Sequence, residues 1–438
     1  MNINIIGGGL AGCECAYYLL KLGYNITLYE MRPNVNTEVH KTSNLCELVC
    51  SNSLKSVDLQ NSQGLLKAEM EKLDSLVIKS AKLTSVPAGG ALAVDRINFS
   101  KEVESKLFEF PNFKLVREEI TTLDDERFND SIVVIATGPL TSEKLCSYIQ
   151  KVTGNTELNF YDAVAPIVEY DSIDKEKSFF GGRYNKGGDD YINCPLNEEE
   201  YNVFYEELVN AECVILKDFE NKDIFNACMP IEVMAKKGKD TMRFGPLRPV
   251  GFRYPNSDKR PYAIVQLRKE DNYNKLYNLV GFQTNLKFNE QKRVFSLIPA
   301  LNKAEFVRYG VMHKNIFIDS TKLLNPDFSL KNKQNVYVIG QLSGVEGYIE
   351  SAMCGIICAI NIDRQLKGKL SIIPSENTSI GSLIKYITSP NKNFQPMHVS
   401  FSLIPDLDTK IRDKKERKLQ KSLRALKYMD EYIELIKK

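Results

Sequence analysis

Histidine is scarce in this chain of 438 residues, and its ten cysteines form no C-x-x-C pair. The histidines are His40, His313 and His398. Structural zinc sites need closely spaced cysteines and histidines, so the sequence argues against bound zinc. Most of the cysteines are expected to be small, buried apolar residues. Ten cysteines behind an N-terminal core strand, with no room for a signal peptide, predict a reducing cytoplasm.

Long apolar runs are also missing, and this predicts a protein without a membrane span. The net charge is only +2, so any basic face for nucleic acid must be local. A chain of this length exceeds one ordinary hydrophobic core, and two domains are expected.

The first thirty residues carry the clearest pattern. An apolar strand over 3–6 precedes a helix pattern over 11–24, and a second strand ends at Glu30. Between the first strand and the helix lie the glycines of a G-x-G-x-x-G motif, Gly7, Gly9 and Gly12. This is the sequence context of a dinucleotide-binding unit.

Each part of this pattern has a physical reason. Gly7 permits a tight turn, and Gly9 lets the backbone approach a pyrophosphate at the positive end of the helix. Gly12 lets helix and strand pack closely. Glu30 can accept a hydrogen bond from a ribose 2′-hydroxyl. By analogy with flavoproteins, the position of the motif near the N-terminus favours FAD over NAD.

A second strand–glycine–helix unit comes late in the chain. A buried strand over 336–340 leads into a glycine-rich turn and a helix over 348–362. The unit predicts that the first domain is completed near the C-terminus. An ordinary strand–helix crossover would have the same sequence pattern and is the alternative. We therefore expect an α/β, Rossmann-like FAD-binding domain that is discontinuous, with an inserted α+β domain. The predicted parts are 1–160, 161–300 and 301–438.

Two further helices are predicted, over 65–81 and over the basic tail 410–438. The tail has an apolar stripe at helical spacing, which we expect to pack on the protein. Its basic face is either an RNA contact or a solvated surface. The stripe consists of Leu419, Leu423, Leu426, Met429, Tyr432 and Ile436.

Two cysteines lie in polar stretches that could carry chemistry. Pro230 suits an early helix position, which would place Cys228 near a helix N-terminus, where the dipole favours thiolate. Cys50 lies in a polar loop that should face the cofactor. Both are candidate nucleophiles, and a buried structural role is the alternative.

Lysines and arginines gather after Cys228 and again after residue 286, with aromatic residues among the second set. Such a combination suits an RNA groove or a folate with its anionic tail, and ordinary surface charge is the alternative. The sets are Lys236, Lys237, Lys239, Arg243, Arg248 and Arg253, then Lys287, Lys292, Arg293 and Arg308 with Phe282, Phe288, Phe306 and Tyr309.

Taken together, these stretches resemble the folate- and FAD-dependent tRNA (uracil-C5-)-methyltransferases, the TrmFO family, nearly end to end. Glucose-inhibited-division flavoproteins share the fold but usually run longer. The blocks that carry the resemblance include GGGLAG, ELVCSNSLKS, VPAGGALAVDR, ATGPLTS, NACMPIEVMA, GPLRPVG, GFQTNLKF, RYGVMHKN and GQLSGVEGYIESA.

The resemblance implies a reaction. A methylene group passes from 5,10-methylenetetrahydrofolate to C5 of a uridine, at position 54 in the T-loop of tRNA, and reduced FAD supplies the hydride. NADH or NADPH regenerates the flavin. Cys228 matches the cysteine that adds to C6 of uracil. Cys50 matches a second cysteine, thought to assist methylene handling or proton removal at C5.

Further positions are implied for FAD. The phosphate loop would be Gly7, Gly8, Gly9, Leu10, Ala11 and Gly12, and the flavin-side turn would include Gly340, Gln341 and Gly347. The open alternatives are the same chemistry on 23S ribosomal RNA, an RNA-binding flavoprotein that does not methylate, and a flavin oxidoreductase without an RNA substrate.

One position departs from the family pattern. Asn285 lies where a histidine is common, and asparagine cannot titrate near neutral pH. The change would suit a different way of handling protons or folate, or a paralogue that acts on another RNA.

Overall fold

The computed structural model describes residues 2–37, 39–154, 158–163, 165–185, 190–214, 229–255, 257–270, 275–310, 312–391 and 394–438. Of residues 158–163, 185 and 312–315 it describes the backbone alone. Cys228, predicted above to act as a nucleophile, lies outside the described residues.

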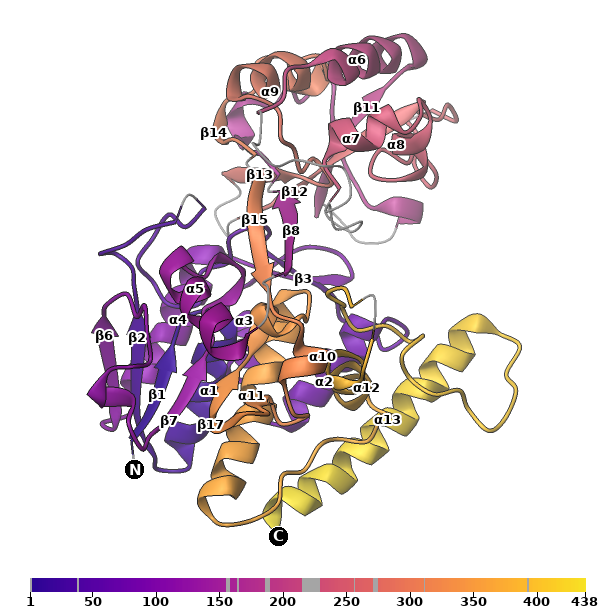
Figure 1. Ribbon diagram of the computed structural model, residues 1–438. Helices are drawn as coiled ribbons and strands as arrows, with labels where there is room; N and C mark the ends of the chain where they lie inside the picture. The colour runs from indigo at the N-terminus through magenta and orange to yellow at the C-terminus, as the bar shows by residue number, and fades with distance from the viewer. Residues whose placement is uncertain are drawn as a thin grey trace.

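A six-stranded sheet organises the lower part of the molecule (Figure 1). Its order is β16-β17-β7-β1-β2-β6; the strands from β17 to β6 are parallel, and β16 is antiparallel at the edge. The late strand β17 pairs directly with β7, which confirms the predicted completion of this sheet by the C-terminal part of the chain. The strands are β1 (Asn2–Ile6), β2 (Asn25–Glu30), β6 (Phe113–Arg117), β7 (Ile132–Ile135), β16 (Ser329–Leu330) and β17 (Lys333–Val338).

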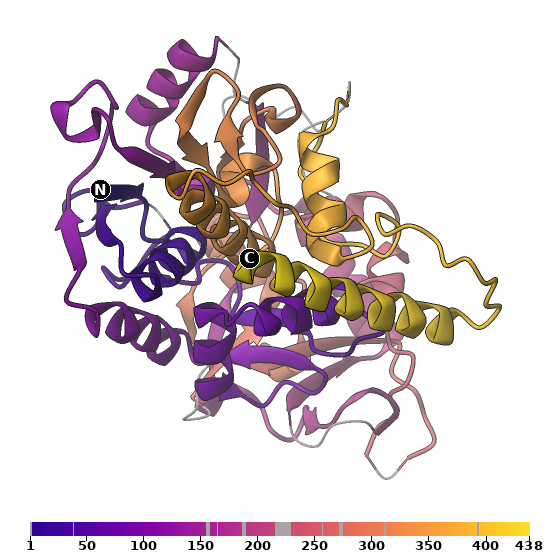
Figure 2. The same cartoon turned by 90° about the horizontal axis from the view of Figure 1, so that it is seen from below.

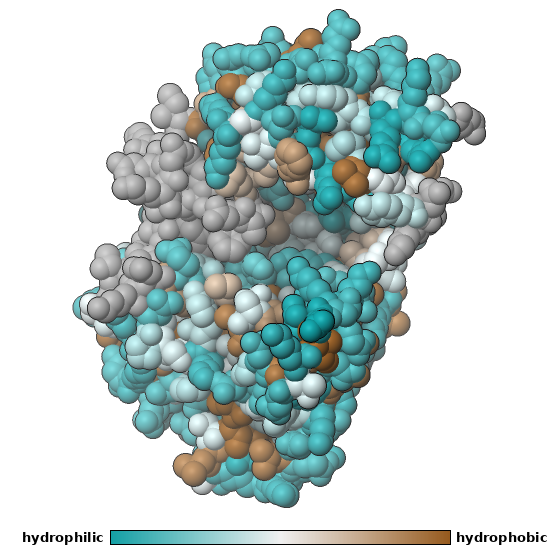
Figure 3. All heavy atoms as spheres, turned by 90° about the vertical axis from the view of Figure 1, so that its right-hand side faces the viewer, coloured by the Kyte–Doolittle hydropathy of each residue, from teal (hydrophilic) through white to brown (hydrophobic). Residues whose placement is uncertain are grey.

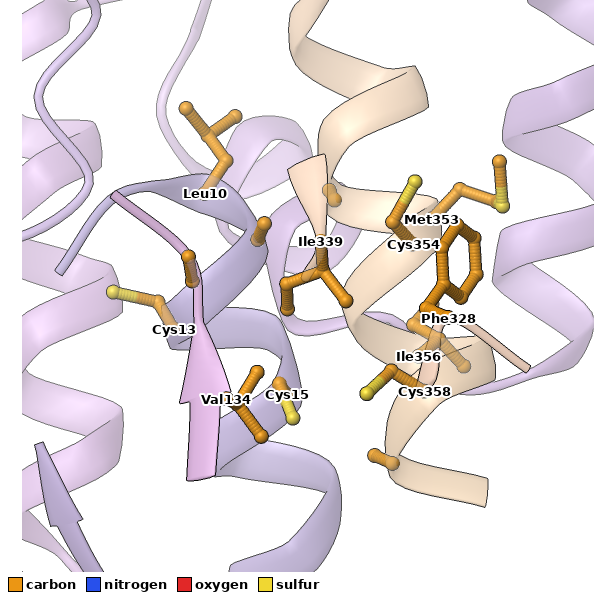
Figure 4. Packing of buried hydrophobic residues seen from close by; sticks show 14 of the residues in the cluster. Leu10, Cys13, Cys15, Val134, Phe328, Ile339, Met353, Cys354, Ile356 and Cys358 are labelled. Carbon is orange, nitrogen blue, oxygen red and sulfur yellow. The ribbon is translucent and has the colours of Figure 1, made fainter. Parts of the chain in front are cut away.

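Two helices follow the central strands and pack tightly on each other: α1 (Leu10–Lys21) after β1, and α11 (Tyr348–Leu366) after β17. A Cβ on Gly355 of α11 would lie 2.3 Å from the carbonyl oxygen of Ala11, so only glycine permits this approach. Figure 4 shows the apolar side chains at the contact. They include the buried cysteines Cys15, Cys354 and Cys358, as expected for cysteine in a core. Cys13 is also buried, but it points away from α11 and donates to the carbonyl of Gly8 at 3.3 Å.

The helix predicted over 65–81 is interrupted, which corrects that prediction. Asp74 has a φ of 65°, and the hydroxyl of Ser75 accepts the N–H of Ile78, capping a new helix. The remaining elements of this part are α2 (Ser62–Lys72), α3 (Leu76–Leu83), α4 (Arg96–Phe108), α5 (Glu143–Thr153), α10 (Ser320–Leu323), α12 (Ser379–Thr388) and a small sheet of β3 (Ser53–Ser56), β5 (Ala91–Val94) and β4 (Ser85–Val86).

A second six-stranded sheet, entirely antiparallel, forms the upper part and has its own apolar core. Its order is β10 (Phe179–Phe180), β11 (Tyr191–Leu196), β12 (Ala263–Lys269), β13 (Leu276–Leu279), β9 (Ile167–Glu169) and β14 (Phe306–Arg308). The helices of this part are α6 (Glu198–Asn210), α7 (Ile231–Lys236), α8 (Thr241–Phe244) and α9 (Phe288–Phe295).

The chain passes between the two parts along β8 (Leu158–Ala163) and β15 (Met312–Phe317), which form a two-stranded antiparallel ladder (Figure 1). All strands of the second sheet lie between these two strands in sequence. The last of them, β14, follows residue 300. The division of the chain at residues 160 and 300 stays a prediction.

The basic tail forms the helix α13 (Lys414–Lys437), which lies across the lower part beside α2 (Figure 2). It docks on the protein, as predicted. The docked face differs from the predicted stripe in one respect, because Leu423 is 47% exposed. The buried residues are Lys421, Ser422, Ala425, Met429 and Tyr432.

The tight contact of α1 with α11 leads to a first prediction. Alanine is a better helix former than glycine by about 1 kcal/mol, so Gly355→Ala would stabilise an open helix. Here we expect the new methyl group to push α11 from α1 and to lower stability by about 1–3 kcal/mol, measured as a lower Tm. Gly90→Ala, whose Cβ would meet no atom within 4 Å, is the matched control. A Tm of Gly355→Ala at or above the wild-type value would contradict the steric argument.

Candidate active site

The glycine-rich turn after β1 has the conformation that its sequence predicts. Gly7 has a φ of 107°, and a Cβ there would lie 2.5 Å from the carbonyl oxygen of Ala136. A Cβ on Gly12 would lie 2.0 Å from the oxygen of Gly7. At Gly9, in contrast, a Cβ would meet no atom within 4 Å. The turn is therefore closed toward the protein at Gly7 and Gly12 and open at Gly9.

Glu30 is tied to this turn by the protein itself. Its carboxylate accepts the N–H of Gly8 at 2.9 Å and the Nε–H of Arg32 at 2.8 Å, and its side chain is almost fully buried. Burial alone would raise the pKa of Glu30, but the hydrogen bonds and charge of Arg32 outweigh it and lower the pKa. Arg32 also pairs with Glu47 at 3.0 Å. Glu30 is thus an ionised acceptor beside the turn, and its contact with a ribose stays a prediction.

The late glycines form a second turn against the first. Gly340 has a φ of 75°, and a Cβ there would lie 2.9 Å from the Cβ of Ala11. Gly347 has a φ of 122° and is the N-cap of α11. Gln341 donates a hydrogen bond to Glu346 at 2.8 Å. The two glycine turns thus lie together, although they are more than 300 residues apart in sequence.

Both turns border one cleft at the carboxyl ends of the parallel strands, the usual place for a ligand in an open α/β sheet. Its lining includes the stretch Gly7–Ala11, Glu30, Gly340, Gln341 and Tyr348. Gly12 and Gly347 support the turns and are not part of the lining. Counted with its open mouth, the cleft has a volume of about 1020 Å³.

Two observations indicate that the cleft can accommodate a dinucleotide. The backbone at Gly9 is open to close approach. In the part of the chain that the structure describes, no side chain caps the N-terminus of α1 or of α11. Two helix ends with positive dipoles therefore border the cleft and favour an anionic ligand.

The loop that carries Cys50 lies at this cleft, as predicted. Val49 lines it, and the half-buried Cys50 follows. The Sγ of Cys50 is 2.9 Å from the hydroxyl of Tyr348, the first residue of α11, and the N–H of Cys50 donates to the same hydroxyl at 2.8 Å. Burial, followed by the neighbouring Cys50, raises the pKa of Tyr348, so this hydroxyl stays protonated at neutral pH.

Arginines from both parts of the molecule hold the Cys50 loop. Arg96, which pairs with Glu270 at 2.7 Å, donates to the carbonyl of Leu48 at 2.7 Å. Arg308 of β14 donates to the carbonyl of Val49 at 2.8 Å. Arg268 of β12 donates to the hydroxyl of Ser51 at 2.8 Å. Burial lowers the pKa of Arg268 and of Arg308, as expected for cations removed from water.

Sequence reasoning missed Tyr348, Arg32, Arg96 and Arg268 as site residues, and it assigned Arg308 to a nucleic-acid or folate groove. The position of Tyr348 directly after the late glycine turn was a usable signal, as was Arg96 at the end of the block VPAGGALAVDR. The hydrogen bond of Arg268 to the Cys50 loop joins residues more than 200 positions apart, and no local sequence pattern predicts it.

Near the other cysteine, the described chain resumes at Met229, and Pro230 is the N-cap of α7. Asn285 has a structural role in this region. Its side-chain amide donates to the carbonyl of Val214 at 3.1 Å, and its N–H donates to Glu232 at 2.8 Å. Burial raises the pKa of Glu232. Asn285 therefore ties the last residue described before Cys228 to the helix that begins just after it.

The two predicted basic sets differ in the structure. Several members of the second set are paired: Lys287 with Glu212 at 2.5 Å, and Arg293 with Glu290 at 2.8 Å. Phe282 is buried in the core, while the ring of Tyr309 stacks with those of Phe288 and Phe306. In the first set, Arg243 and Arg253 pair with Asp240 and Asp258, while Lys236, Lys237, Lys239 and Arg248 are exposed and form no ion pair with another described residue. The first set is thus the more open to an anionic partner.

Among the described residues, no group of three histidines, cysteines or acidic residues is arranged to hold a metal ion. Of the helices in those residues, none combines the length and the apolar character that crossing a membrane requires.

The fold can be compared with a solved structure. That of Aquifex aeolicus GidA in the form II crystal superposes with a TM-score of 0.69, at 14% identity, over 98% of this chain and 73% of that chain. The family model described as Glucose inhibited division protein A matches residues 2–370. The fold and the double glycine turn thus define a GidA-like flavoprotein with a Rossmann-like nucleotide-binding sheet.

Curated relatives narrow this class. One from Persephonella marina, named methylenetetrahydrofolate--tRNA-(uracil-5-)-methyltransferase TrmFO, is 51% identical over 429 residues, 98% of each chain. One from Caldicellulosiruptor bescii with the same name is 53% identical over 428 residues, 97% of each chain. The chain belongs to the folate- and FAD-dependent tRNA (uracil-C5-)-methyltransferase family, TrmFO.

The position of Glu30 leads to a second prediction. In Glu30→Gln we expect less bound flavin per purified chain, measured by the visible absorbance. We also expect the free energy of unfolding to fall by about 2 kcal/mol, because the charge-assisted hydrogen bonds to Gly8 and Arg32 are weakened. Because the pKa of Glu30 is lowered in the folded protein, its contribution to stability is present above its ordinary pKa and disappears as the pH falls. The two proteins should therefore converge in stability in acid. Asp408→Asn, at an exposed aspartate, is the control, and equal flavin content in Glu30→Gln would exclude the predicted contact.

Proposed function

We propose that this chain forms 5-methyluridine in tRNA, at position 54 of the T-loop, with the methylene group of 5,10-methylenetetrahydrofolate. The observation that carries the proposal is the identity of about half, over nearly the full length, to relatives with this activity in their names. The structural support is a half-buried thiol, Cys50, at the rim of a dinucleotide cleft.

In this proposal the cleft holds FAD. Reduced FAD supplies the hydride that converts the transferred methylene group into a methyl group, and NADH or NADPH restores the reduced flavin. The stretch Gly7–Gly12 and the N-terminus of α1 hold the pyrophosphate. Glu30 receives the adenosine ribose, and the turn that contains Gly340, Gln341 and Gly347 borders the flavin.

The two cysteines have different roles, and Cys228 activates the uridine. C5 of uracil is a weak nucleophile. When the thiolate of Cys228 adds to C6, the electron pair of the C5–C6 bond moves into an enolate, which makes C5 nucleophilic. Once the methylene carbon has bonded to C5, loss of the C5 proton expels the tetrahydrofolate nitrogen and leaves an exocyclic methylene group. Addition of hydride to that group forms the methyl and returns the enolate, which expels the thiolate of Cys228 and restores the C5–C6 double bond. We assign to Cys50 the handling of the methylene group or the removal of the C5 proton.

A basic and aromatic face of the upper part suits the RNA. Burial and the nearby charge of Arg248 lower the pKa of Arg183, so these two cations lie close enough to repel each other. Phe244 is 83% exposed and Tyr184 is 65% exposed on the same part of the chain. Crowded cations attract phosphates, and exposed rings stack on bases. Figure 3 shows that the surface is hollowed between this part and the nucleotide-binding part.

The proposal is tested with purified protein, methylenetetrahydrofolate, NADH and separate pools of unmodified tRNA and 23S rRNA. We expect nucleoside mass spectrometry to find 5-methyluridine in the T-loop of tRNA. Methylation of rRNA alone would keep the chemistry and replace the substrate. A reducible flavoprotein that methylates neither pool would contradict the proposal.

The covalent step gives another prediction. Because the enolate forms only after thiolate addition, Cys228→Ala should lose methylation almost completely while the flavin content stays at the wild-type level. Cys213→Ala, at a half-buried cysteine of the same part, should keep its activity. Methylation by Cys228→Ala at the wild-type rate would rule out the covalent step at this residue.

A further inference from the structure

The peptide unit before Cys50 is held at both ends by different parts of the fold. Its carbonyl, that of Val49, accepts hydrogen bonds from Arg308 of β14 at 2.8 Å and from Arg96 of α4 at 3.3 Å. Its N–H donates to the hydroxyl of Tyr348, on α11, at 2.8 Å. The orientation of this peptide, and of the thiol that follows it, therefore depends on the upper sheet and the nucleotide-binding part together.

The hydrogen bonds at the Tyr348 hydroxyl fix the direction of its own proton. The oxygen receives the N–H of Cys50 at 2.8 Å and the N–H of Ser51 at 3.3 Å. A phenol oxygen has two acceptor sites and one proton to donate. With both acceptor sites used, the O–H points to the remaining neighbour, the Sγ of Cys50 at 2.9 Å. A thiol that donated to this oxygen instead would be its third donor.

We propose that Tyr348 is a positioning residue for Cys50: its hydroxyl donates a hydrogen bond to Sγ and so favours the thiolate over the thiol. This inference deepens the proposed function and rests on the part that Cys50 takes in it. It explains how a cysteine on a loop without regular structure is held in a reactive form, because donors aimed at sulfur stabilise the charged state.

The charges around the loop act in the same direction. Three guanidinium groups interact electrostatically with Cys50, those of Arg96, Arg268 and Arg308. Glu270 is paired with Arg96 at 2.7 Å, and Glu47 with Arg32 at 3.0 Å. Arg32 is shared between Glu47 and Glu30, while Arg268 and Arg308 form no ion pair with another described residue, so four guanidinium groups face three carboxylates around the loop.

The test is the pH dependence of alkylation in the full-length flavoprotein. Iodoacetamide reacts with thiolate, sulfur displacing iodide, and peptide mass spectrometry follows each cysteine separately. The midpoint pH measures the proton affinity of the thiol, and the plateau rate measures its accessibility. In Tyr348→Phe we expect the Cys50 midpoint to rise by at least about one unit, which means about tenfold slower alkylation at neutral pH. The half-buried Cys213 is the internal control.

The matched variant is Tyr24→Phe. It also removes a tyrosine hydroxyl that bonds to α11, at Asp363 and 2.8 Å, but at the far end of that helix, about 20 Å from Tyr348 at 1.5 Å per residue. We expect its Cys50 midpoint to equal that of the wild type. A changed plateau with an unchanged midpoint in Tyr348→Phe would mean that the tyrosine only shields the loop, and this would overturn the inference, as would a lower midpoint.

The wild-type protein gives a second check that needs no variant. The Cys50 midpoint should lie below that of Cys213, whose pKa is raised by burial. A Cys50 midpoint above that of Cys213 would overturn the inference. The rate of methylation distinguishes this inference from the proposed function. A raised Cys50 midpoint in Tyr348→Phe with an unchanged rate of methylation would support the hydrogen bond and contradict the role assigned to Cys50 in the reaction.

Discussion

The close contact between α1 and α11 determines where the ligand can bind. Gly355 lets the backbone of α11 reach the carbonyl of Ala11, and Gly340 brings the late turn against the side chain of the same alanine. The N-termini of both helices consequently border one cleft. A helix end attracts negative charge only over about its first turn, so a wider separation would leave two weak sites in place of one cleft with a positive rim.

The Cys50 loop is the second point at which distant parts of the chain meet. It has no regular structure until β3 begins at Ser53, and groups from α4, α11, β12 and β14 hold it. The Asn52 amide adds hydrogen bonds to the carbonyls of Val94 and Lys269 at 3.1 and 2.8 Å. Because arginines supply many of these bonds, the loop is held by charge-assisted contacts that are stronger than neutral ones.

Local patterns predicted what depends on local geometry. The spacing of Gly7, Gly9 and Gly12 gave the turn, and the strand that leads into Gly340 gave the late half of the nucleotide-binding sheet. Glu30 was found because the pattern places an acid at the end of the second strand. Its partner Arg32 was missed, although it is only two residues away, because a buried ion pair leaves no periodic signal.

The contacts of Tyr348 and Arg308 were beyond sequence reasoning for another reason. They join residues about 300 and 260 positions apart. The first contact depends on the return of β17 to the nucleotide-binding sheet, and the second on the contact of the upper sheet with the Cys50 loop. The interruption at Asp74 was missed because a helical hydrophobic spacing continues across it, while the backbone there takes a left-handed conformation.

The ladder of β8 and β15 has a consequence for how this architecture can vary. The upper part leaves and re-enters the nucleotide-binding part through two strands that lie side by side. Its two ends are therefore neighbours whatever lies between them, and lengthening a loop whose ends already meet costs little chain entropy, about 0.6 kcal/mol per doubling. An enzyme built in this way can enlarge or remodel its upper part and keep the geometry of the nucleotide cleft unchanged.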